Sequence, residues 1–535
     1  MVRAAGAARV FLWRRACALA LLALAFGIAT ALHVPAPVHA AASETLIPVR
    51  GFRFSGHSAF DAEALASITA DFAGRELSFA ELEQAAERVT QFYRDRGYLV
   101  AQALIPAQEI GADGIVEIAV HEGRYGRVAV QNASRLKQGI AEAALEAGPV
   151  ASGALIAAAP LERALLLLDE LPGVTARGEL SAGREPGTSD LTVYVRDGER
   201  FTGILRVDNS GHELTGRVRG TVMVDADNLR GFADRLSLQV TSSGSGLLHG
   251  SANYSAPVND TPLRLGVGYT SSRYEMGGAL TALDVEGTMS AWRLSLRYPV
   301  LRALPRPAVP AVWVHRLDAE LVAEQRDLQD IVAGFSGDRQ VQALQLAARG
   351  SGQAWGGTLE FGAVATAGRL HIVDAVERLY DDLTALTEGE FVKVHAEATH
   401  RRPVGRGMSL RASVSGQWAS KNLHSSEKFA LGGAHAVRAY APGEASGDTG
   451  VLAGVELRGR LFGSAWWWAG FVDAGYVQIN KDPWQEGVNT RSLFGAGAGL
   501  VYAPGSSFDL RVDYAVPVPY DTAGGRLGVA ANVRW

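Results

Sequence analysis

Cysteine is almost absent from this chain of 535 residues: the one cysteine, Cys17, lies in an apolar N-terminal segment. We expect that segment to be removed, so the mature chain would contain no cysteine and could not be held together by disulfide bonds. Cys17 also lacks the run of small residues that precedes the cysteine of a lipoprotein signal. The scarcity of cysteine therefore argues against a disulfide scaffold and against a lipid anchor.

Long apolar runs and long basic runs are also missing from the rest of the chain. No stretch after residue 40 approaches 18 apolar residues, so we expect no transmembrane helix. A transmembrane β-strand needs only about ten residues of alternating character, and this absence does not bear on it. The formal net charge is −5 and falls to about −9 without the four N-terminal arginines, so nucleic acid is not an expected partner.

The sequence motifs of common enzymes are absent as well. There is no Gly-x-Ser-x-Gly motif, no His-Glu-x-x-His motif, no paired-cysteine metal site and no P-loop. His121-Glu122 has no second histidine at the spacing of a zinc site. The glycines at 495–499 alternate with alanine, which is typical of a strand rather than of a phosphate-binding loop. We therefore expect no enzyme, no metal site and no cofactor.

Residues 1–40 have the organisation of a secretory signal peptide. Four arginines are followed by an apolar run from Ala16 to Leu32, and Val38-His39-Ala40 offers small residues at a cleavage site. A membrane anchor is the alternative, but the run is barely long enough to span a bilayer. Arg14-Arg15 lacks the rest of a twin-arginine signal, which favours the Sec route.

Residues 44–126 are predicted to form a small α+β unit. A strand at 47–54 comes first, and Ser78 with Glu81 three residues later forms a capping box at the start of the second helix. Gly97 ends that helix, and strands at 98–104 and 115–120 follow. The helix has a continuous apolar face made of Leu82, Ala85, Ala86, Val89, Phe92 and Tyr93.

Residues 127–198 are predicted to form a second unit of similar size. Leu161, Leu165 and Leu168 lie on one face of its second helix, and an alternating strand at 191–195 closes it. Two tandem units of about 75 residues are each too small for an enzyme of ordinary size. We expect them to be binding domains.

From about residue 200 to residue 535 the apolar pattern has a period of two. About sixteen runs of roughly ten to fourteen residues have one apolar and one polar face, and an even number suits a closed transmembrane β-barrel. A soluble β-sandwich or propeller also alternates, but its strands are usually shorter. Short connections at 350–352 and 503–505 alternate with long ones at 367–388 and 421–447. The last residue, Trp535, continues the apolar face of the final strand, as barrel assembly signals do.

In this order of segments the chain resembles the two-partner secretion transporters of the haemolysin secretion/activation type, over nearly all of its mature length. These transporters have two polypeptide-transport-associated (POTRA) domains and a sixteen-stranded barrel. The resemblance in the first unit rests on residues 93–98 and 105–108, and in the second on residues 165–174 and 185–190. The matching structural positions are Gly97, Tyr98, Pro106, Gln108, Pro172 and Gly173.

Two barrel motifs carry the resemblance further. The family has a Val-Arg-Gly-Tyr signature in its sixth extracellular loop, and the matching residues are Val437, Arg438, Ala439 and Tyr440, with alanine in place of glycine. This loop, here 421–447, folds back into the pore in the family. A second motif on the thirteenth strand is matched by Phe471, Asp473 and Gly475.

The alternation of strand 466–476 gives the second motif a position. Trp466, Val472 and Tyr476 share the apolar face, so Phe471, Asp473 and Gly475 face the lumen. Asp473 is then placed to bind the Arg438 guanidinium with bidentate geometry, and Gly475 leaves room for the loop tip. The alternatives are an ordinary pore-lining acid and a solvated loop cation. Ala439 leaves the backbone angles of the tip open, because glycine adopts positive φ more readily than alanine.

The resemblance implies a function and its partners. The chain would export a large exoprotein with an N-terminal secretion domain across the outer membrane, its POTRA domains capturing the unfolded client in the periplasm. Periplasmic chaperones, the barrel assembly machinery and outer-membrane lipid are further implied partners. Only about six residues separate Ala40 from the first strand, so we expect no N-terminal plug helix. The alternatives are an outer-membrane assembly factor of the same superfamily and a passive porin.

Overall fold

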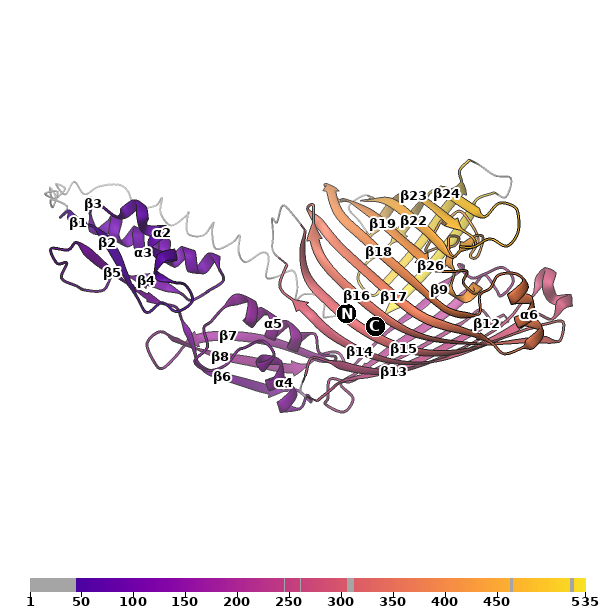
Figure 1. Cartoon of the computed structure of the whole chain (residues 1–535), viewed down its shortest axis with the longest axis horizontal. Helices are drawn as coiled ribbons and strands as arrows, with labels where there is room; N and C mark the ends of the chain where they lie inside the picture. Colours follow the sequence, from indigo (N-terminus) through magenta and orange to yellow (C-terminus); the bar gives the residue numbers. More distant parts are fainter. Residues whose placement is uncertain (1–44, 245, 260, 306–311, 462–464, 520–523) are drawn as a thin grey trace, which may run out of the picture.

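Two small modules of sheet and helix precede a closed β-barrel in the computed structural model (Figure 1). The structure describes residues 45–244, 246–259, 261–305, 312–461, 465–519 and 524–535. The signal peptide expected at 1–40 lies outside the described residues, and so does the segment in which no plug helix is expected. No helix in these described ranges has the length and the apolar character needed to cross a membrane.

The first module is built around the amphipathic helix α3. Ser78 caps this helix through the predicted capping box with Glu81, which the structure confirms. Its apolar face packs on strands, with Leu82, Val89 and Tyr93 fully buried. The elements of the module are β1 (Ile47–Val49), β2 (Gly51–Ser55), α2 (Ala62–Thr69), η1 (Ala70–Phe72), β3 (Arg75–Leu77), α3 (Phe79–Asp95), β4 (Gln102–Leu104) and β5 (Ile115–His121).

The single first strand predicted at 47–54 is wrong, because the chain breaks it at Arg50. The Arg50 N–H donates to the Gly114 carbonyl at 2.8 Å, and this turns the strand from one sheet to another. β1 pairs with β3, whereas β2 runs parallel to β5 in a three-stranded sheet with β4 at the other edge. The predicted strand at 98–104 is also shorter and covers only β4.

The second module repeats the plan with one sheet and two helices. Its sheet has the order β6-β8-β7, with β6 parallel to β8 and β7 antiparallel to it. Leu161, Leu168 and Val193 lie in its buried core, so the predicted helix face points inward. The elements are β6 (Arg124–Ala133), α4 (Gln138–Glu146), α5 (Ala158–Asp169), β7 (Val174–Ala182) and β8 (Thr188–Asp197).

Sixteen antiparallel strands form the closed barrel, as predicted, and the last strand, β26, pairs with the first, β9. Closure gives every lipid-facing strand two neighbours, which satisfies its backbone polar groups. The strands are β9 (Phe201–Asp208), β10 (Arg219–Asp227), β11 (Arg235–Ser242), β12 (Leu247–Pro257), β13 (Arg264–Glu275), β14 (Glu286–Arg302), β15 (Trp313–Val332), β16 (Phe335–Ala354), β17 (Gly357–Ile372), β18 (Gly389–Gly405), β19 (Met408–Ala419), β22 (Thr449–Arg460), β23 (Trp466–Gln478), β24 (Thr490–Tyr502), β25 (Phe508–Pro517) and β26 (Arg526–Arg534).

Two predicted connections of the barrel need correction. Residues 350–352 are not a turn: they lie inside β16, and the chain reverses at Trp355 and Gly356 between β16 and β17. Gly350 and Gly352 suggested a turn in the sequence, but both pair with residues of β17 in the sheet. The long connection expected from 367 begins after β17 ends at Ile372, and it contains helix α6 (Ala375–Leu383).

The C-terminal Trp535 lies beside the seam between the last and first strands. Its backbone N–H donates to the Gly203 carbonyl at 3.2 Å and its carbonyl accepts from the Gly203 N–H at 3.1 Å. The indole covers Gly203, where a Cβ would come within 2.2 Å of a ring atom. Regular β26–β9 pairing covers only five residue pairs, so Trp535 extends the shortest seam of the barrel.

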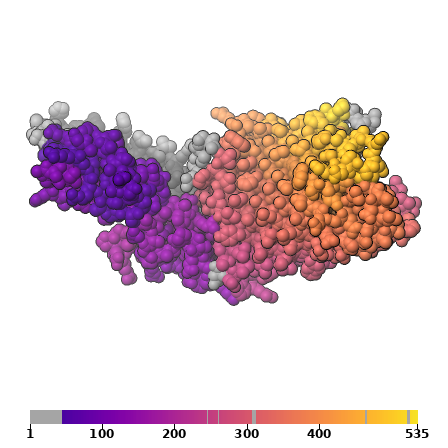
Figure 2. All heavy atoms as spheres, viewed as in Figure 1, coloured from indigo at the N-terminus to yellow at the C-terminus, as the bar shows by residue number. Residues whose placement is uncertain are grey.

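An ion-pair network with the buried Arg302 at its centre joins the second module to the barrel. Glu170, at the end of α5, accepts from Arg302 of β14 at 2.6 Å and from Arg316 of β15 at 2.9 Å. Arg302 also binds Asp318 at 2.8 Å. In Figure 2 the second module lies against the end of the barrel that faces the two modules. These contacts fix the module at one mouth of the barrel.

Glu122 stabilises the first module by accepting several hydrogen bonds. It is buried, and its carboxylate accepts from the backbone N–H groups of Ser58 and Ala59 at 2.6 Å each, from the Ser58 hydroxyl and from Tyr93 at 3.0 Å. Burial alone would raise the pKa of Glu122, but the hydrogen bonds from Ala59 and Ser58 outweigh it and lower the pKa below its usual value.

Glu122→Gln is expected to destabilise the first module at neutral pH by about 1–3 kcal/mol, because the donors lose an ionised acceptor. The lowered pKa means that this stabilisation is complete above about pH 5 and is lost as the pH falls through the folded-state pKa. Hydrogen exchange of peptides from residues 45–123 in the full-length protein measures it.

The exposed Glu87 provides the matched control, since Glu87→Gln removes a solvated charge from α3. The difference between Glu122→Gln and the parent protein should shrink on acidification, whereas Glu87→Gln should match the parent throughout. A constant difference across the pH range would contradict the assigned role.

Candidate functional site in the barrel lumen

One long loop folds back into the barrel and carries the candidate site. Loop 6, residues 420–448, joins β19 to β22 and contains η3 (Ser425–Glu427), β20 (Phe429–Ala430) and β21 (Ser446–Gly447). Leu431 and Val437 are fully buried, and they pack with Phe429, Val477 and Leu493. The loop is therefore held against the inner wall by an apolar cluster as well as by charges.

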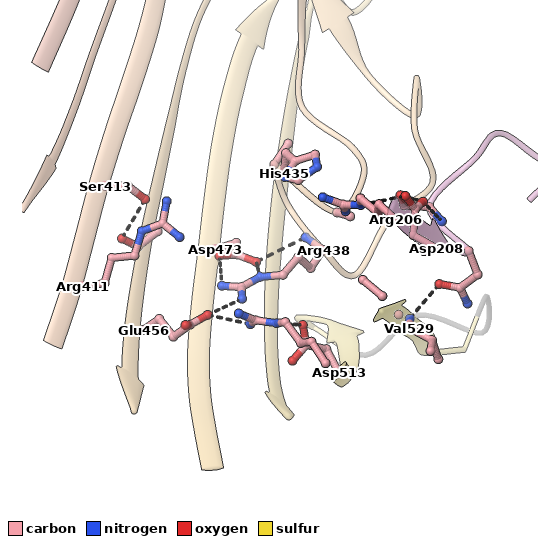
Figure 3. A pocket seen from close by; sticks show the side chains of 18 of the residues that line it. Arg206, Asp208, Arg411, Ser413, His435, Arg438, Glu456, Asp473, Asp513 and Val529 are labelled. Atoms are coloured by element: carbon pink, nitrogen blue, oxygen red, sulfur yellow. Dashed lines mark hydrogen bonds and ion pairs between the residues drawn. The ribbon is translucent and has the colours of Figure 1, made fainter. Parts of the chain in front are cut away.

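Arg438 at the loop tip binds Asp473 on β23 (Figure 3). Its Nε donates to Asp473 Oδ2 and its Nη2 to Asp473 Oδ1, both at 2.8 Å, which is the bidentate geometry of an arginine–carboxylate pair. The Arg438 backbone N–H also donates to Oδ2, at 3.2 Å. The guanidinium carbon lies 3.4 Å from the centre of the Phe471 ring, a cation–π contact. The structure thus brings together three of the predicted residues.

A second acid, Glu456 on β22, shares the guanidinium. Arg438 Nη1 donates to Glu456 Oε2 at 2.6 Å, and Glu456 also accepts from Arg511 at 2.8 Å and from Arg458. Arg511 in turn binds Asp513 at 2.5 Å. The sequence argument missed Glu456, Arg458 and Arg511, because a lumen-facing charge on an alternating strand carries no signal that separates it from its neighbours. The connected network contains three arginines and three acids, and its formal charge is zero.

Small residues on β23 and β24 make room for the loop. A Cβ on Gly475 would come within 2.6 Å of Leu431, so Gly475 accommodates the base of the loop rather than its tip. The tip instead lies against Gly495, where a Cβ would come within 2.7 Å of the Ala439 methyl. Ala439 is not among the described residues with positive φ, so alanine fits the tip without strain. Val437, Arg438, Ala439 and Tyr440 therefore form a compact turn, in which the Tyr440 N–H donates to the Val437 carbonyl.

Ion pairs fasten the stem of the loop to the wall. Glu427 binds Arg326 at 2.6 Å and Lys393 at 2.7 Å, and Lys428 binds the fully buried Asp448 at 3.0 Å. Below the tip lies a cavity of about 400 Å³ that is lined by charged side chains, among them Arg411 and Asp473. The loop thus occupies the lumen but leaves a polar space beside Arg438.

The predicted positions of the first module have structural contacts. Gly97, with φ +92°, ends α3, and Tyr98 packs edge-on against Tyr93 with ring centres 5.6 Å apart. The Gln108 amide donates to the Glu117 carbonyl at 2.9 Å and accepts its N–H at 2.7 Å, like a residue of a neighbouring strand. The Pro106 carbonyl accepts a further bond from Gln108.

In the second module, Pro172 and Gly173 form the turn after α5. Gly173 has φ +66°, and a Cβ there would come within 3.1 Å of Asp227 and Asn228, where β10 ends and the connection to β11 begins. The predicted positions in the two modules thus lie far from loop 6 along the chain, and their contacts hold turns and strands of the modules together. No group of three or more metal-binding side chains occurs in the described part of the chain.

Comparison with known families places the parts of the chain. Residues 47–123 match the ShlB-type POTRA domain, and residues 187–307 match the haemolysin secretion/activation protein ShlB/FhaC/HecB. Residues 382–526, which include loop 6 and β23, match the Omp85 superfamily domain. The matches follow the order of the modules and the barrel.

Curated relatives match the chain over most of its length. The heme/hemopexin transporter protein HuxB of Haemophilus influenzae is 28% identical over 473 residues, which cover 85% of this chain and 80% of HuxB. The outer membrane transporter CdiB of Dickeya dadantii is 24% identical over 472 residues, with the same shares. This chain is a two-partner secretion transporter. The family expected from the sequence is confirmed.

Solved structures support the fold of the transporter. CdiB from Escherichia coli has a TM-score of 0.74 at 19% identity and covers 100% of both chains. BamA from Haemophilus ducreyi, without its POTRA domains 1–3, has a TM-score of 0.51 at 13% identity and covers 92% of this chain and 100% of BamA. The comparisons favour export of an exoprotein over barrel assembly or passive diffusion. The transporter lies in the outer membrane with its modules in the periplasm. Loop 6 therefore joins β19 to β22 at the extracellular end of the barrel.

Arg438→Ala is expected to loosen loop 6 and to raise the ion conductance of the transporter in planar bilayers. Removing one partner of a buried pair leaves Asp473 uncompensated, at a cost of about 3–5 kcal/mol. Arg438→Lys should give an intermediate conductance, because an ammonium cannot make the bidentate contact. The control is Arg217→Ala, which breaks an exposed 2.9 Å pair with Glu213 outside loop 6 and should leave conductance unchanged. Equal conductance in Arg438→Ala and the parent would refute the anchor.

Proposed function

We propose that the transporter captures its unfolded client at the two periplasmic modules and conducts it through the barrel when loop 6 releases Arg438. The observation that carries this proposal is the bidentate Arg438–Asp473 contact inside the lumen, made by a loop whose ends lie outside. Such a loop obstructs the path of a client while the contact lasts. Its movement opens the path without unfolding the barrel.

The charges around Arg438 suit a reversible contact. When Arg438 leaves, Glu456 keeps its bonds to Arg458 and Arg511, so only Asp473 loses its partner. Arg411 lies opposite Glu456 in the register of β19 and β22 and has no ion pair of its own among the described residues. It is a cation in place to compensate the added negative charge. The cost of release is therefore confined to one carboxylate.

Capture at the modules follows from their sheet edges. β2 and β4 are the edges of the first three-stranded sheet, and β6 and β7 are those of the second. An extended client segment can add to such an edge through its main chain, which tolerates many side chains. The Glu170 network would hold the second module at the barrel mouth, so a captured segment is delivered to the lumen.

The client we propose is a large exoprotein with an N-terminal secretion domain. Relatives are named for heme/hemopexin transport and as CdiB transporters, so clients of either kind are candidates. The periplasm supplies no nucleotide, and we propose that folding of the client outside the cell drives export. Assembly machinery would read Trp535, chaperones would keep the client unfolded, and no cofactor or catalytic step is involved.

The proposed limits of the parts follow the sequence: a signal peptide at 1–40, POTRA domains at 44–126 and 127–198, and the barrel at 200–535. The loop-tip positions 437–440 and the lumen positions Phe471, Asp473 and Gly475 form the proposed anchor. Gly97, Tyr98, Pro106, Gln108, Pro172 and Gly173 are proposed to shape the modules.

Arg438→Ala and Asp473→Ala are each expected to abolish secretion. Without the Arg438–Asp473 contact, loop 6 has no defined bound position from which a client could release it. Secretion is measured as client in the culture medium at equal abundance of the transporter in the outer membrane. Arg217→Ala, the exposed control outside loop 6, should secrete normally. Normal secretion by both anchor variants would refute the role of the contact in export.

Deleting residues 44–198 is expected to stop secretion while the remaining barrel still conducts ions. The deletion removes the sheet edges but leaves the barrel strands and loop 6 intact. Client in the medium and single-channel conductance are measured on the same variant. Continued export by the deletion variant would contradict capture by the modules, and loss of conductance would show that the barrel itself had failed.

A further inference from the structure

The outer wall of the barrel contains a shallow groove of about 730 Å³ across β14 to β18. These strands lie side by side on the wall nearer the viewer in Figure 1. In one cross-strand row of this wall, large and small outward side chains alternate: Leu294, Ala323, Leu344, Ala367 and Val392 are successive neighbours. The leucines and the valine form the ridges of the groove, and the space above the alanines forms its floor.

The next row toward the extracellular ends is polar. Gln325, Gln342, Arg369 and Glu390 are successive neighbours there, two residues beyond the apolar row on each strand. Trp292 continues the row and packs against Tyr269, with ring centres 4.7 Å apart. Trp and Tyr are typical of the boundary between acyl chains and headgroups. The groove is therefore apolar along its floor and polar at its extracellular end.

The polar end has unused hydrogen-bonding groups. The side chains of Arg369 and Glu390 make no hydrogen bond or ion pair with any residue that the structure describes, and both are exposed. An arginine on the lipid-facing side of a barrel is unfavourable unless a polar partner from the membrane or water satisfies it. A phosphate is such a partner, because the guanidinium binds it with two parallel bonds.

We propose that this groove binds one lipopolysaccharide molecule of the outer leaflet through its lipid A. An acyl chain lies on the apolar floor, a phosphate binds Arg369, and the sugar hydroxyl and amide groups bind Gln342, Gln325 and Glu390. The groove is continuous with the lipid-facing wall, and its polar end faces the leaflet in which this glycolipid lies. A phosphatidylethanolamine has a phosphate for Arg369 but no sugar for the other three side chains.

Native mass spectrometry of the purified full-length transporter in detergent tests the proposal by titration with lipid A and, separately, with phosphatidylethanolamine. The parent protein should bind one lipid A in preference to phosphatidylethanolamine. Arg369→Ala removes the phosphate ligand and is expected to weaken lipid A binding about tenfold. Ala367→Leu fills the floor with a larger side chain and should weaken it by a similar factor.

Two matched controls lie on the same outer surface but outside the groove. Arg273→Ala removes an outward arginine that is paired with Glu286 at 3.0 Å, and Ala453→Leu enlarges an outward alanine on β22. Both should bind lipid A within a factor of two of the parent, and heat-modifiable electrophoretic mobility checks that every variant is folded. The proposal is overturned if phosphatidylethanolamine binds as tightly as lipid A, if groove variants bind like the parent, or if controls lose binding equally.

Discussion

The constraint on which this structure depends is that no strand in the bilayer can leave its backbone N–H and C=O groups unpaired. Lipid supplies no hydrogen bonds, so the sheet must close, and here β26 meets β9 over five residue pairs with Trp535 extending the seam. Closure turns the apolar faces of all strands outward and the polar faces inward. The lumen is a consequence of this closure.

Loop 6 enters this lumen with its charge compensated by the wall. Bringing Arg438 into the barrel completes a neutral network with Glu456, Asp473, Arg458, Arg511 and Asp513. A buried ion pair adds little stability compared with an apolar contact of the same shape, but it specifies one position of the loop. The apolar packing of Leu431 and Val437 against the wall stabilises the loop in the same position. Charge and apolar contacts together thus specify one position of the loop.

The junction between the second module and the barrel uses the same chemistry for a different purpose. Glu170 is held by Arg302 and Arg316, and Gly173 packs against the connection between β10 and β11. The orientation of the module at the mouth is therefore set by specific contacts rather than by the linker alone. On the outer wall, the groove over β14 to β18 arises from the order of large and small side chains across neighbouring strands. Inside and outside, the shape and charge of the wall are set by neighbours on adjacent strands.

The sequence by itself determined the order of the modules and the barrel, because helical and strand periodicities report which face of each element is buried. It also determined that Asp473 faces the lumen, since alternation along β23 fixes the parity of every side chain. It could not determine that Arg50 splits the first strand, that 350–352 continue β16, or that Gly495 receives the loop tip. Those features depend on neighbours distant in the chain, and so does the role of Glu456. Only the closed barrel brings these residues together, because register and close packing are properties of pairs of strands and not of any one segment.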